Sequence, residues 1–220
     1  MSEVVIVGAS ELARLALSFL REVTTLKPVA CAVAEEYRPG AELGDLPVVA
    51  LEELRVSHPP SEYELLVCLG YRRVNRARQE VTETVRAEGY QLASLLHPAS
   101  WISPDAELGD GCIVFPGTVV EPFATVGAGG ILWSGSVVAH DTRVGDFCFL
   151  APNATVAGNV TLGDRCFVGA NATVRDGIVV GTDCIIGAGA VVKHDTESGT
   201  VYSAAATRPG PQPSASYDTV

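Results

Sequence analysis

The sequence predicts two architectures in one chain, a small α/β domain followed by a three-sided β-solenoid. Three observations support this prediction. An aliphatic residue recurs at every sixth position from Ile102 to Val192, without an insertion. A small residue nearly always follows four positions later, and glycine often follows directly. Before His97, short aliphatic runs alternate with stretches of helical periodicity.

The six-residue period excludes an α-helix, because about 100° per residue would scatter every sixth side chain over three directions. A β-solenoid uses this period directly. Three hexads form one triangular coil of about 18 residues, and stacked coils bury a continuous aliphatic core. Glycine directly after the aliphatic residue suits a tight corner. The repeat therefore predicts a solenoid of about five coils.

Cysteines of the repeat fall in one column, because they share the small hexad position and lie whole coils apart: Cys112, Cys148, Cys166 and Cys184. No histidine shares the column, and the repeat already explains the spacing. We therefore interpret them as small, reduced packing residues and not as a metal site. Cys31 and Cys68 lie in apolar runs and are interpreted in the same way.

The first part of the chain alternates strands and helices, which predicts a Rossmann-like parallel sheet covered by helices. We expect strands at 4–7, 29–33, 46–50, 63–69 and 91–96, and helices at 11–22, 51–56 and 74–88. His97-Pro98 marks the passage into the solenoid. The predicted domains are 1–97 and 98–202, followed by a flexible tail at 203–220 that is rich in proline and serine.

Charge and hydropathy restrict the possible partners and the compartment. The 220 residues carry a formal net charge of −11, which argues against nucleic acid or an anionic membrane as a main partner. No apolar run has the length of a transmembrane helix, and no basic flank precedes the first apolar run. We expect a cytoplasmic protein.

Candidate ligand contacts occur at three places in the first domain. The turn Gly8-Ala9-Ser10 follows the first strand, where backbone N–H groups could hold a phosphate. Glu35 and Glu36 follow the second strand, where a carboxylate could bind a ribose hydroxyl. After Gly70, arginines at the start of a helix oppose its dipole, and a pyrophosphate would relieve this: Arg72, Arg73, Arg76 and Arg78. A plain turn, a solvated loop and a water-exposed helix face remain the alternatives.

Taken together, the two halves resemble the hexapeptide-repeat sugar acyltransferases related to sialic acid O-acetyltransferase and to N-acetyltransferases of nucleotide-linked 4-amino sugars. The matching segments are Gly8-Ala9-Ser10, Gly70 to Arg78, His97-Pro98 and Ala139 to Gly158. The chain has Glu11-Leu12 where many members have Gly-His, and Ala34 near where an Asp commonly ends the second strand. The resemblance implies a left-handed parallel β-helix, acetyl-CoA as donor, and a homotrimer with coenzyme A between subunits.

The resemblance also assigns the chemistry. His140 and Asp141 match the family's catalytic histidine and its acidic neighbour. His140 would act as general base toward a sugar amine or hydroxyl, and Asp141 would orient the imidazole. Gly158 lies one coil, about 4.8 Å, beyond His140, so its N–H could stabilise the oxyanion. His194 shares this column without matching a family motif, and we expect an ordinary surface residue there.

Coenzyme A contacts are expected at repeat corners, together with the N–H of Gly158: Gly169, Ala170, Gly187 and Ala188. No metal is expected. Trp133 is bulky for its hexad position and is expected to shape the acceptor site or a subunit contact.

The predicted function is therefore an acetyl-CoA-dependent acetyltransferase acting on a nucleotide-linked amino sugar. O-acetylation and a non-sugar acceptor are its variants. The alternative from another class is a non-catalytic solenoid that binds a nucleotide or a partner protein, because a fold does not determine a function.

Overall fold

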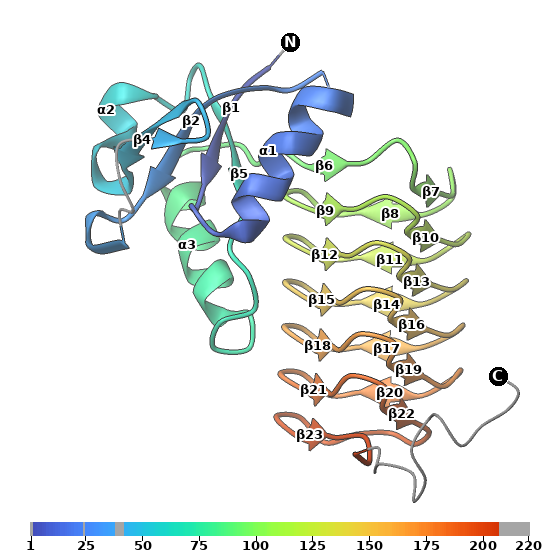
Figure 1. The fold of residues 1–220 in the computed structure, drawn as a ribbon. Coiled ribbons are helices and arrows are strands. Elements are labelled where there is room, and N and C mark those ends of the chain that lie inside the picture. Colours follow the sequence, from blue (N-terminus) through green and yellow to red (C-terminus); the bar gives the residue numbers. More distant parts are fainter. Residues whose placement is uncertain (1, 24, 38–41, 207–220) are drawn as a thin grey trace, which may run out of the picture.

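The structure is a computed structural model that describes residues 2–23, 25–37 and 42–206. Most of the tail predicted at 203–220, from residue 207 onward, lies outside the described residues. An α/β domain lies against one side of a long stack of short strands (Figure 1). Within the described ranges, no helix is long and apolar enough to cross a membrane.

The α/β domain contains one five-stranded sheet in the order β3-β4-β2-β1-β5. All pairs are parallel except β3 with β4. Its elements are β1 (Glu3–Val7), α1 (Glu11–Val23), β2 (Lys27–Val33), η1 (Glu35–Tyr37), β3 (Glu42–Leu43), β4 (Leu46–Ala50), η2 (Leu51–Glu53), α2 (Leu54–Ser57), β5 (Glu64–Val67) and α3 (Arg76–Ala87). The parallel strands have buried runs such as Val4 to Val7, because helices cover the sheet.

Three expectations for this domain need correction. The helix expected at 51–56 is a 3₁₀ turn followed by the short α2. The helix expected from Val74 begins at Arg76, because Arg73, Val74 and Asn75 adopt left-handed backbone angles. The strand expected at 91–96 is divided: Leu92 forms a single bridge to Leu65, and Leu95–Leu96 already pairs with the solenoid as β6.

The solenoid is a left-handed β-helix with three parallel sheets, which we call faces 1, 2 and 3. Face 1 contains β6 (Leu95–Leu96), β9 (Ile113–Val114), β12 (Ile131–Leu132), β15 (Phe149–Leu150), β18 (Phe167–Val168), β21 (Ile185–Ile186) and β23 (Val201–Tyr202). Face 2 contains β7 (Trp101–Ile102), β10 (Val119–Val120), β13 (Val137–Val138), β16 (Thr155–Val156), β19 (Thr173–Val174) and β22 (Val191–Val192). Face 3 contains β8 (Glu107–Leu108), β11 (Thr125–Val126), β14 (Arg143–Val144), β17 (Thr161–Leu162) and β20 (Val179–Val180).

From β7 to β22, the second residue of each strand is the aliphatic residue of the predicted period, and it points into the solenoid. These side chains and the small residues four positions later form one buried cluster. The four cysteines of the repeat are fully buried in it, and each thiol donates to a backbone carbonyl at 3.1 to 3.3 Å. The cysteine column therefore packs and hydrogen-bonds as a structural element of the core.

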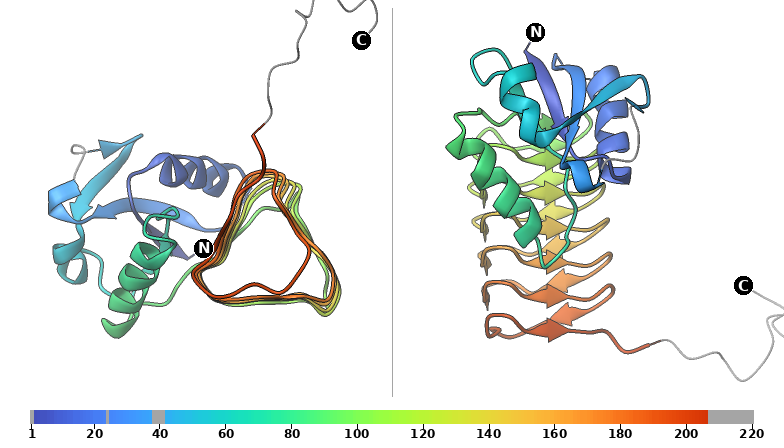
Figure 2. Two further views of the ribbon diagram at one scale, coloured as in Figure 1. Left: turned by 90° about the horizontal axis from the view of Figure 1, so that it is seen from below. Right: turned by 90° about the vertical axis from the view of Figure 1, so that its left-hand side faces the viewer.

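Seen along its axis, the solenoid is a triangle with the α/β domain on one side (Figure 2). That side is face 1. Helix α1 and face 1 share a second buried cluster, in which Leu12, Leu17 and Ile131 take part. The ring of Phe19 meets Phe115 at 5.5 Å and His97 at 4.9 Å. The two domains are thus joined by a continuous apolar interface.

The triangle has three corners, at which the chain passes from one face to the next. The outer vertex joins faces 2 and 3 and lies opposite face 1. The docking vertex joins faces 3 and 1. Helix α3 and Asn75, the residue before it, lie along this vertex and contact the carbonyls of Gly129, Phe147 and Arg165. The third vertex joins faces 1 and 2. Each vertex repeats with every coil, about 4.8 Å along the axis.

Candidate active site

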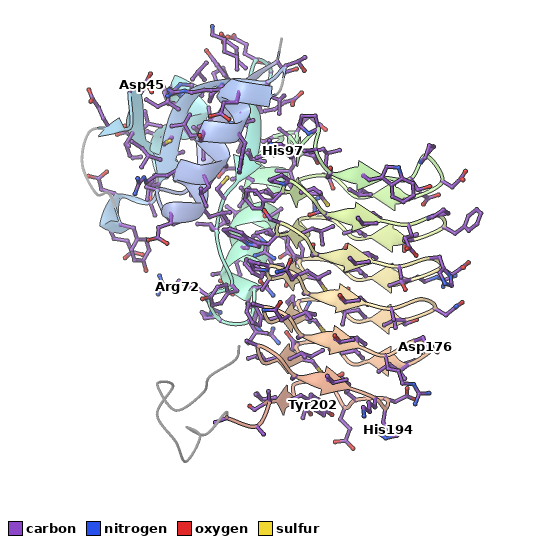
Figure 3. The ribbon with its side chains drawn as sticks, turned by 45° about the vertical axis from the view of Figure 1, so that its right-hand side comes forward. Asp45, Arg72, His97, Asp176, His194 and Tyr202 are labelled. Atoms are coloured by element: carbon purple, nitrogen blue, oxygen red, sulfur yellow. The ribbon has the colours of Figure 1, made fainter. Side chains whose placement is uncertain are left out.

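His140 lies at the outer vertex, between β13 and β14. Its position repeats in the following coils as Gly158, Asp176 and His194. Figure 3 shows Asp176 and His194 at the edge of the solenoid away from the α/β domain, whereas Arg72 and His97 lie at that domain. The side chain of His140 is 56% exposed, so a substrate can reach the imidazole.

Asp141 fixes one side of the His140 ring. Its Oδ2 lies 3.0 Å from Nδ1 of His140. Asp141 has a left-handed backbone with φ of 58°, a conformation that aspartate tolerates better than most residues. Because Nδ1 faces the carboxylate, a neutral imidazole has its proton on Nδ1 and a free lone pair on Nε2. The pair has the arrangement of a general base and its orienting acid.

Gly158 lies directly against the other part of the ring. A Cβ atom added to Gly158 would come within 2.7 Å of both Cε1 and Nε2 of His140. Glycine is therefore the residue that leaves room for the imidazole at this place in the next coil.

Two backbone N–H groups of this column differ in their hydrogen bonds. The N–H of His140 donates to Oε2 of Glu121 at 2.8 Å. The N–H of Gly158 donates to no acceptor in the part of the chain that the structure describes. A buried N–H that is left available beside a general base is the donor that an oxyanion requires.

A pocket of about 870 Å³ lies between the α/β domain and face 1. The predicted residues Gly8, Ala9, Ser10 and Gly70 all line it. Gly8 has φ of 123°, and a Cβ there would come within 2.8 Å of the carbonyl oxygen of Cys68. The turn thus needs glycine for its own geometry, and it presents the N-terminus of α1 to the pocket.

The pocket wall also contains aromatic residues that sequence reasoning did not connect with it. Trp133 and Phe149 of face 1 and Tyr71 after β5 line the pocket, and the Tyr71 ring lies 5.2 Å from Phe149. Trp133 was expected to shape the acceptor site or a subunit contact, and this stays a prediction. Its bulk at this hexad position was the signal in the sequence, but the sequence does not reveal which domain covers face 1.

Arginines of the pocket have separate roles. Arg73 forms a two-point ion pair with Glu80 at 2.7 and 2.8 Å. The guanidinium of Arg72 lies 5.9 Å from the ring centre of Tyr37, and the described residues offer it no carboxylate within salt-bridge distance. Arg72 is therefore the pocket cation best suited to an anion.

Two predicted substrate contacts are corrected by the structure. Arg78 is 1% exposed and lies outside the pocket lining, where five backbone carbonyl oxygens accept its hydrogen bonds. No donor is left for a phosphate. Glu35 is exposed in η1, and its backbone N–H donates to Glu52; it does not line the pocket.

Apart from Gly158, the predicted coenzyme A residues lie at the third vertex and not beside His140. Gly169 and Ala170 follow β18, and Gly187 and Ala188 follow β21. A Cβ on Gly169 would come within 2.5 Å of the N atom of Ala188, so this glycine permits the stacking of adjacent coils. Within one chain, these four residues therefore do not form a single site with His140 and Gly158.

Comparison with known proteins places the chain among transferases. Residues 141–176 match the family model described as bacterial transferase hexapeptide (six repeats), and residues 159–194 match that of the hexapeptide repeat of succinyl-transferase. No curated protein matches.

Solved structures resemble the chain over nearly its whole length. A variant of perosamine N-acetyltransferase from Caulobacter crescentus, in complex with CoA and GDP-perosamine, is 32% identical with a TM-score of 0.84, covering 93% of this chain and 94% of that one. The acetyltransferase domain of PglB from Neisseria gonorrhoeae is 26% identical with a TM-score of 0.83, covering 93% and 97%. WeeI from Acinetobacter baumannii shares the fold at 20% identity, with a TM-score of 0.80 and coverage of 91% and 96%.

Proposed function

This chain belongs to the hexapeptide-repeat sugar acyltransferases, and we propose that it transfers an acetyl group from acetyl-CoA to a nucleotide-linked amino sugar. The observation that carries this proposal is the contact between the His140 ring and Gly158, where a Cβ would lie 2.7 Å from Nε2. The similar protein from Caulobacter crescentus was crystallised with CoA and GDP-perosamine, which supports both substrates.

His140 would act as the general base. Its Nε2 would take the proton that the acceptor amine loses as nitrogen attacks the thioester carbonyl carbon. The carbonyl π electrons move to oxygen, and the N–H of Gly158 would stabilise that negative charge. When the C–S bond breaks, the imidazolium would return the proton to the leaving sulfur. Asp141 would stabilise the imidazolium between these two steps.

We also propose an order for the two substrates along this column of the outer vertex. Gly158 lies on the coil after His140, so the thioester oxygen would lie on that side of the ring. The acceptor would then approach from the coil before, where Glu121 and Phe123 lie. Phe123 is 63% exposed and has a left-handed backbone with φ of 64°. An exposed aromatic residue in this conformation is unusual, and it supports a contact with a substrate or a neighbouring subunit.

We propose that the complete site forms between subunits of a homotrimer. The pocket lies at face 1, whereas His140 lies at the opposite vertex, so a nucleotide-linked sugar held in the pocket would meet the histidine of a neighbour. Face 2 supports such an interface, because it exposes apolar side chains: Trp101 is 53% and Val191 57% exposed. The predicted coenzyme A residues at the third vertex would come from a neighbour in the same way.

Other predictions stay proposals. Domains 1–97 and 98–202 are supported by the change from the α/β sheet to the coils, although β6 begins at Leu95. The cytoplasmic location rests on the sequence alone. Glu121 would hold the backbone at the active histidine through its 2.8 Å hydrogen bond.

The test is thiol release from acetyl-CoA with a panel of nucleotide-linked 4-amino and hydroxy sugars. We expect turnover of one amino sugar and a loss of about 10²-fold or more in His140→Ala, since general bases contribute about 10²- to 10⁴-fold. His194→Ala is the matched control, because this exposed histidine lies in the same column and should retain activity.

Each alternative has its own outcome in this assay. Turnover of a hydroxy sugar alone would establish O-acetylation. If the protein bound CoA but accepted no sugar, the acceptor assignment would be wrong. An absence of CoA binding would favour a non-catalytic solenoid.

A further inference from the structure

The segment between β5 and α3 combines a pocket wall with an unusual backbone. Residues 69–73 line the pocket. The next residues continue into a left-handed turn, in which φ is 54° at Arg73, 52° at Val74 and 64° at Asn75. Left-handed angles are disfavoured for L-residues, and most strongly for a β-branched residue such as Val74. Three in succession persist only where the surroundings hold them in place.

The solenoid supplies the bonds that hold this turn. Nδ2 of Asn75 donates to the carbonyl oxygens of Arg165 at 2.9 Å and Cys166 at 3.2 Å. One turn further along α3, the Nε of Arg78 donates to Gly129 at 3.1 Å. Its Nη2 donates to the carbonyl oxygens of Phe147 at 2.6 Å and Cys148 at 3.3 Å. The two side chains therefore bind the docking vertex on three successive coils.

The same guanidinium also binds the pocket wall. Nη1 of Arg78 donates to the carbonyl oxygens of Leu69 at 3.2 Å and Gly70 at 3.1 Å. One buried side chain thus connects two coils of the solenoid with the two residues that begin the wall. Tyr71, which follows, is held by ring contacts with Phe149 at 5.2 Å and Phe167 at 4.8 Å.

Arg78 is an unusual choice for a purely structural contact. Its side chain is almost fully buried, and no carboxylate pairs with it in the described ranges. Burial lowers the pKa of its guanidinium to about 10. A buried charge without a partner ion is costly, and it is retained here where five donors in a fixed fork are needed to bind five carbonyls at once.

We propose that Arg78 is a positioning residue for the nucleotide pocket, which it serves by fixing Leu69 and Gly70 to the solenoid and so holding Tyr71 and Arg72 in the wall. The role rests on the proposed function of the pocket as the binding site of a nucleotide-linked sugar. Arg78 itself touches no ligand in this proposal. Its loss should weaken nucleotide binding and leave the chemistry at the outer vertex intact.

Arg78→Met tests this role, because methionine fills part of the buried space without any donor. Arg86→Met is the matched control: Arg86 lies on the same helix and forms an ion pair with Asp110 of the solenoid, away from the wall. Three quantities are measured on the full chain: amide hydrogen exchange in residues 69–75, the Kd of GDP, UDP and dTDP by calorimetry, and the steady-state kinetics for both substrates.

We expect Arg78→Met to accelerate amide exchange in 69–75 at least tenfold and to raise Kd for the bound nucleotide and KM for the nucleotide-linked sugar by a similar factor. KM for acetyl-CoA and kcat at saturating sugar should stay within threefold. Arg86→Met should change none of these. A variant that lost kcat and both affinities together would show a general structural role and overturn the proposal, as would an unchanged Kd.

A second variant, Arg78→Lys, tests the proposal if Arg78→Met does not fold. If Arg78→Met is insoluble, Arg78→Lys keeps the charge but cannot reach both the wall and the coils, and the same shifts are expected in it. Wild-type protein that bound none of the nucleotides would overturn the assignment of the pocket and this role of Arg78. Loss of nucleotide binding in the variant alone leaves the proposed function in place, so the two failures are distinguishable.

Discussion

Gly158→Ala tests the arrangement of the candidate active site, because it adds one methyl group against the His140 ring. The new Cβ would lie 2.7 Å from Cε1 and Nε2, whereas ordinary contacts begin at 3.4 Å. The ring must therefore move by about 0.7 Å, the difference between these two distances. A displacement of about 1 Å at a reacting group costs about 10²-fold in rate, or about 2.7 kcal/mol in the barrier.

Stability should change little in this variant. The backbone of Gly158 lies outside the left-handed region, so alanine is not strained there. Replacing glycine reduces the entropy of the unfolded chain and contributes about 0.4 to 1 kcal/mol. Moving the His140 side chain off its rotamer costs about 0.5 to 1.5 kcal/mol, which offsets that gain.

The assay is thiol release at saturating substrates, together with thermal unfolding at one protein concentration. We expect kcat to fall about 10²-fold while Tm moves by only a few degrees. Gly44→Ala is the control, and we expect it to lower Tm and leave kcat unchanged. Gly44 has φ of 65° in the turn between β3 and β4, where alanine is strained, and it lies far from His140. Activity of Gly158→Ala within threefold of wild type would refute the assigned roles of His140 and Gly158.

Two further predictions concern stability and reactivity. Arg165 holds the pKa of the Asp183 carboxyl below its usual value, and Arg76 adds to this effect. The carboxylate therefore contributes to stability at neutral pH, and this contribution is lost as pH falls through the lowered pKa. Asp183→Asn should therefore cost about 1 to 2 kcal/mol at pH 7, and urea unfolding should show this cost shrinking below about pH 4; a constant difference would contradict it. Burial raises the pKa of the Cys31 and Cys112 thiols to about 11, so at pH 8 only about one in 10³ of each is a thiolate, and in the native protein these two should react slowly with a disulfide reagent. All six thiols should react after denaturation. Reaction of Cys31 or Cys112 within seconds in the native protein would disprove their packing role.

The solenoid was predictable because its contacts are local and repeated. Every strand from β7 to β22 contains the aliphatic residue that the six-residue period assigns, and the same count places Gly158 one coil after His140. The position of a residue in the repeat follows from counting along the sequence, and this count needs no information about another domain.

Contacts between the domains could not be predicted in this way. Val74 has the helical spacing expected of α3, yet its backbone is left-handed because Asn75 binds carbonyls about ninety residues further along the chain. The charge of Arg78 suggested a contact with a phosphate, whereas its guanidinium donates to five backbone carbonyl oxygens. Trp133 was recognised as unusual, but its neighbours depend on which face α1 covers. Each of these three residues makes contacts with a part of the chain that is distant in sequence.

The identical coils also determine how the length of this chain can drift in evolution. Loss of one hexad before His140 would leave the aliphatic period and the folded core intact, but it would carry the histidine from the outer vertex to the third vertex. Loss of a whole coil would keep the vertex and shift the histidine by about 4.8 Å relative to the α/β domain. Loss of one hexad would also turn the face 1 residues that pack on α1, such as Ile131, away from that helix, so it should cost stability as well as activity. Loss of a whole coil keeps every residue on its own face, so its main cost should fall on catalysis, and enzyme assays should detect such a change more readily than unfolding measurements.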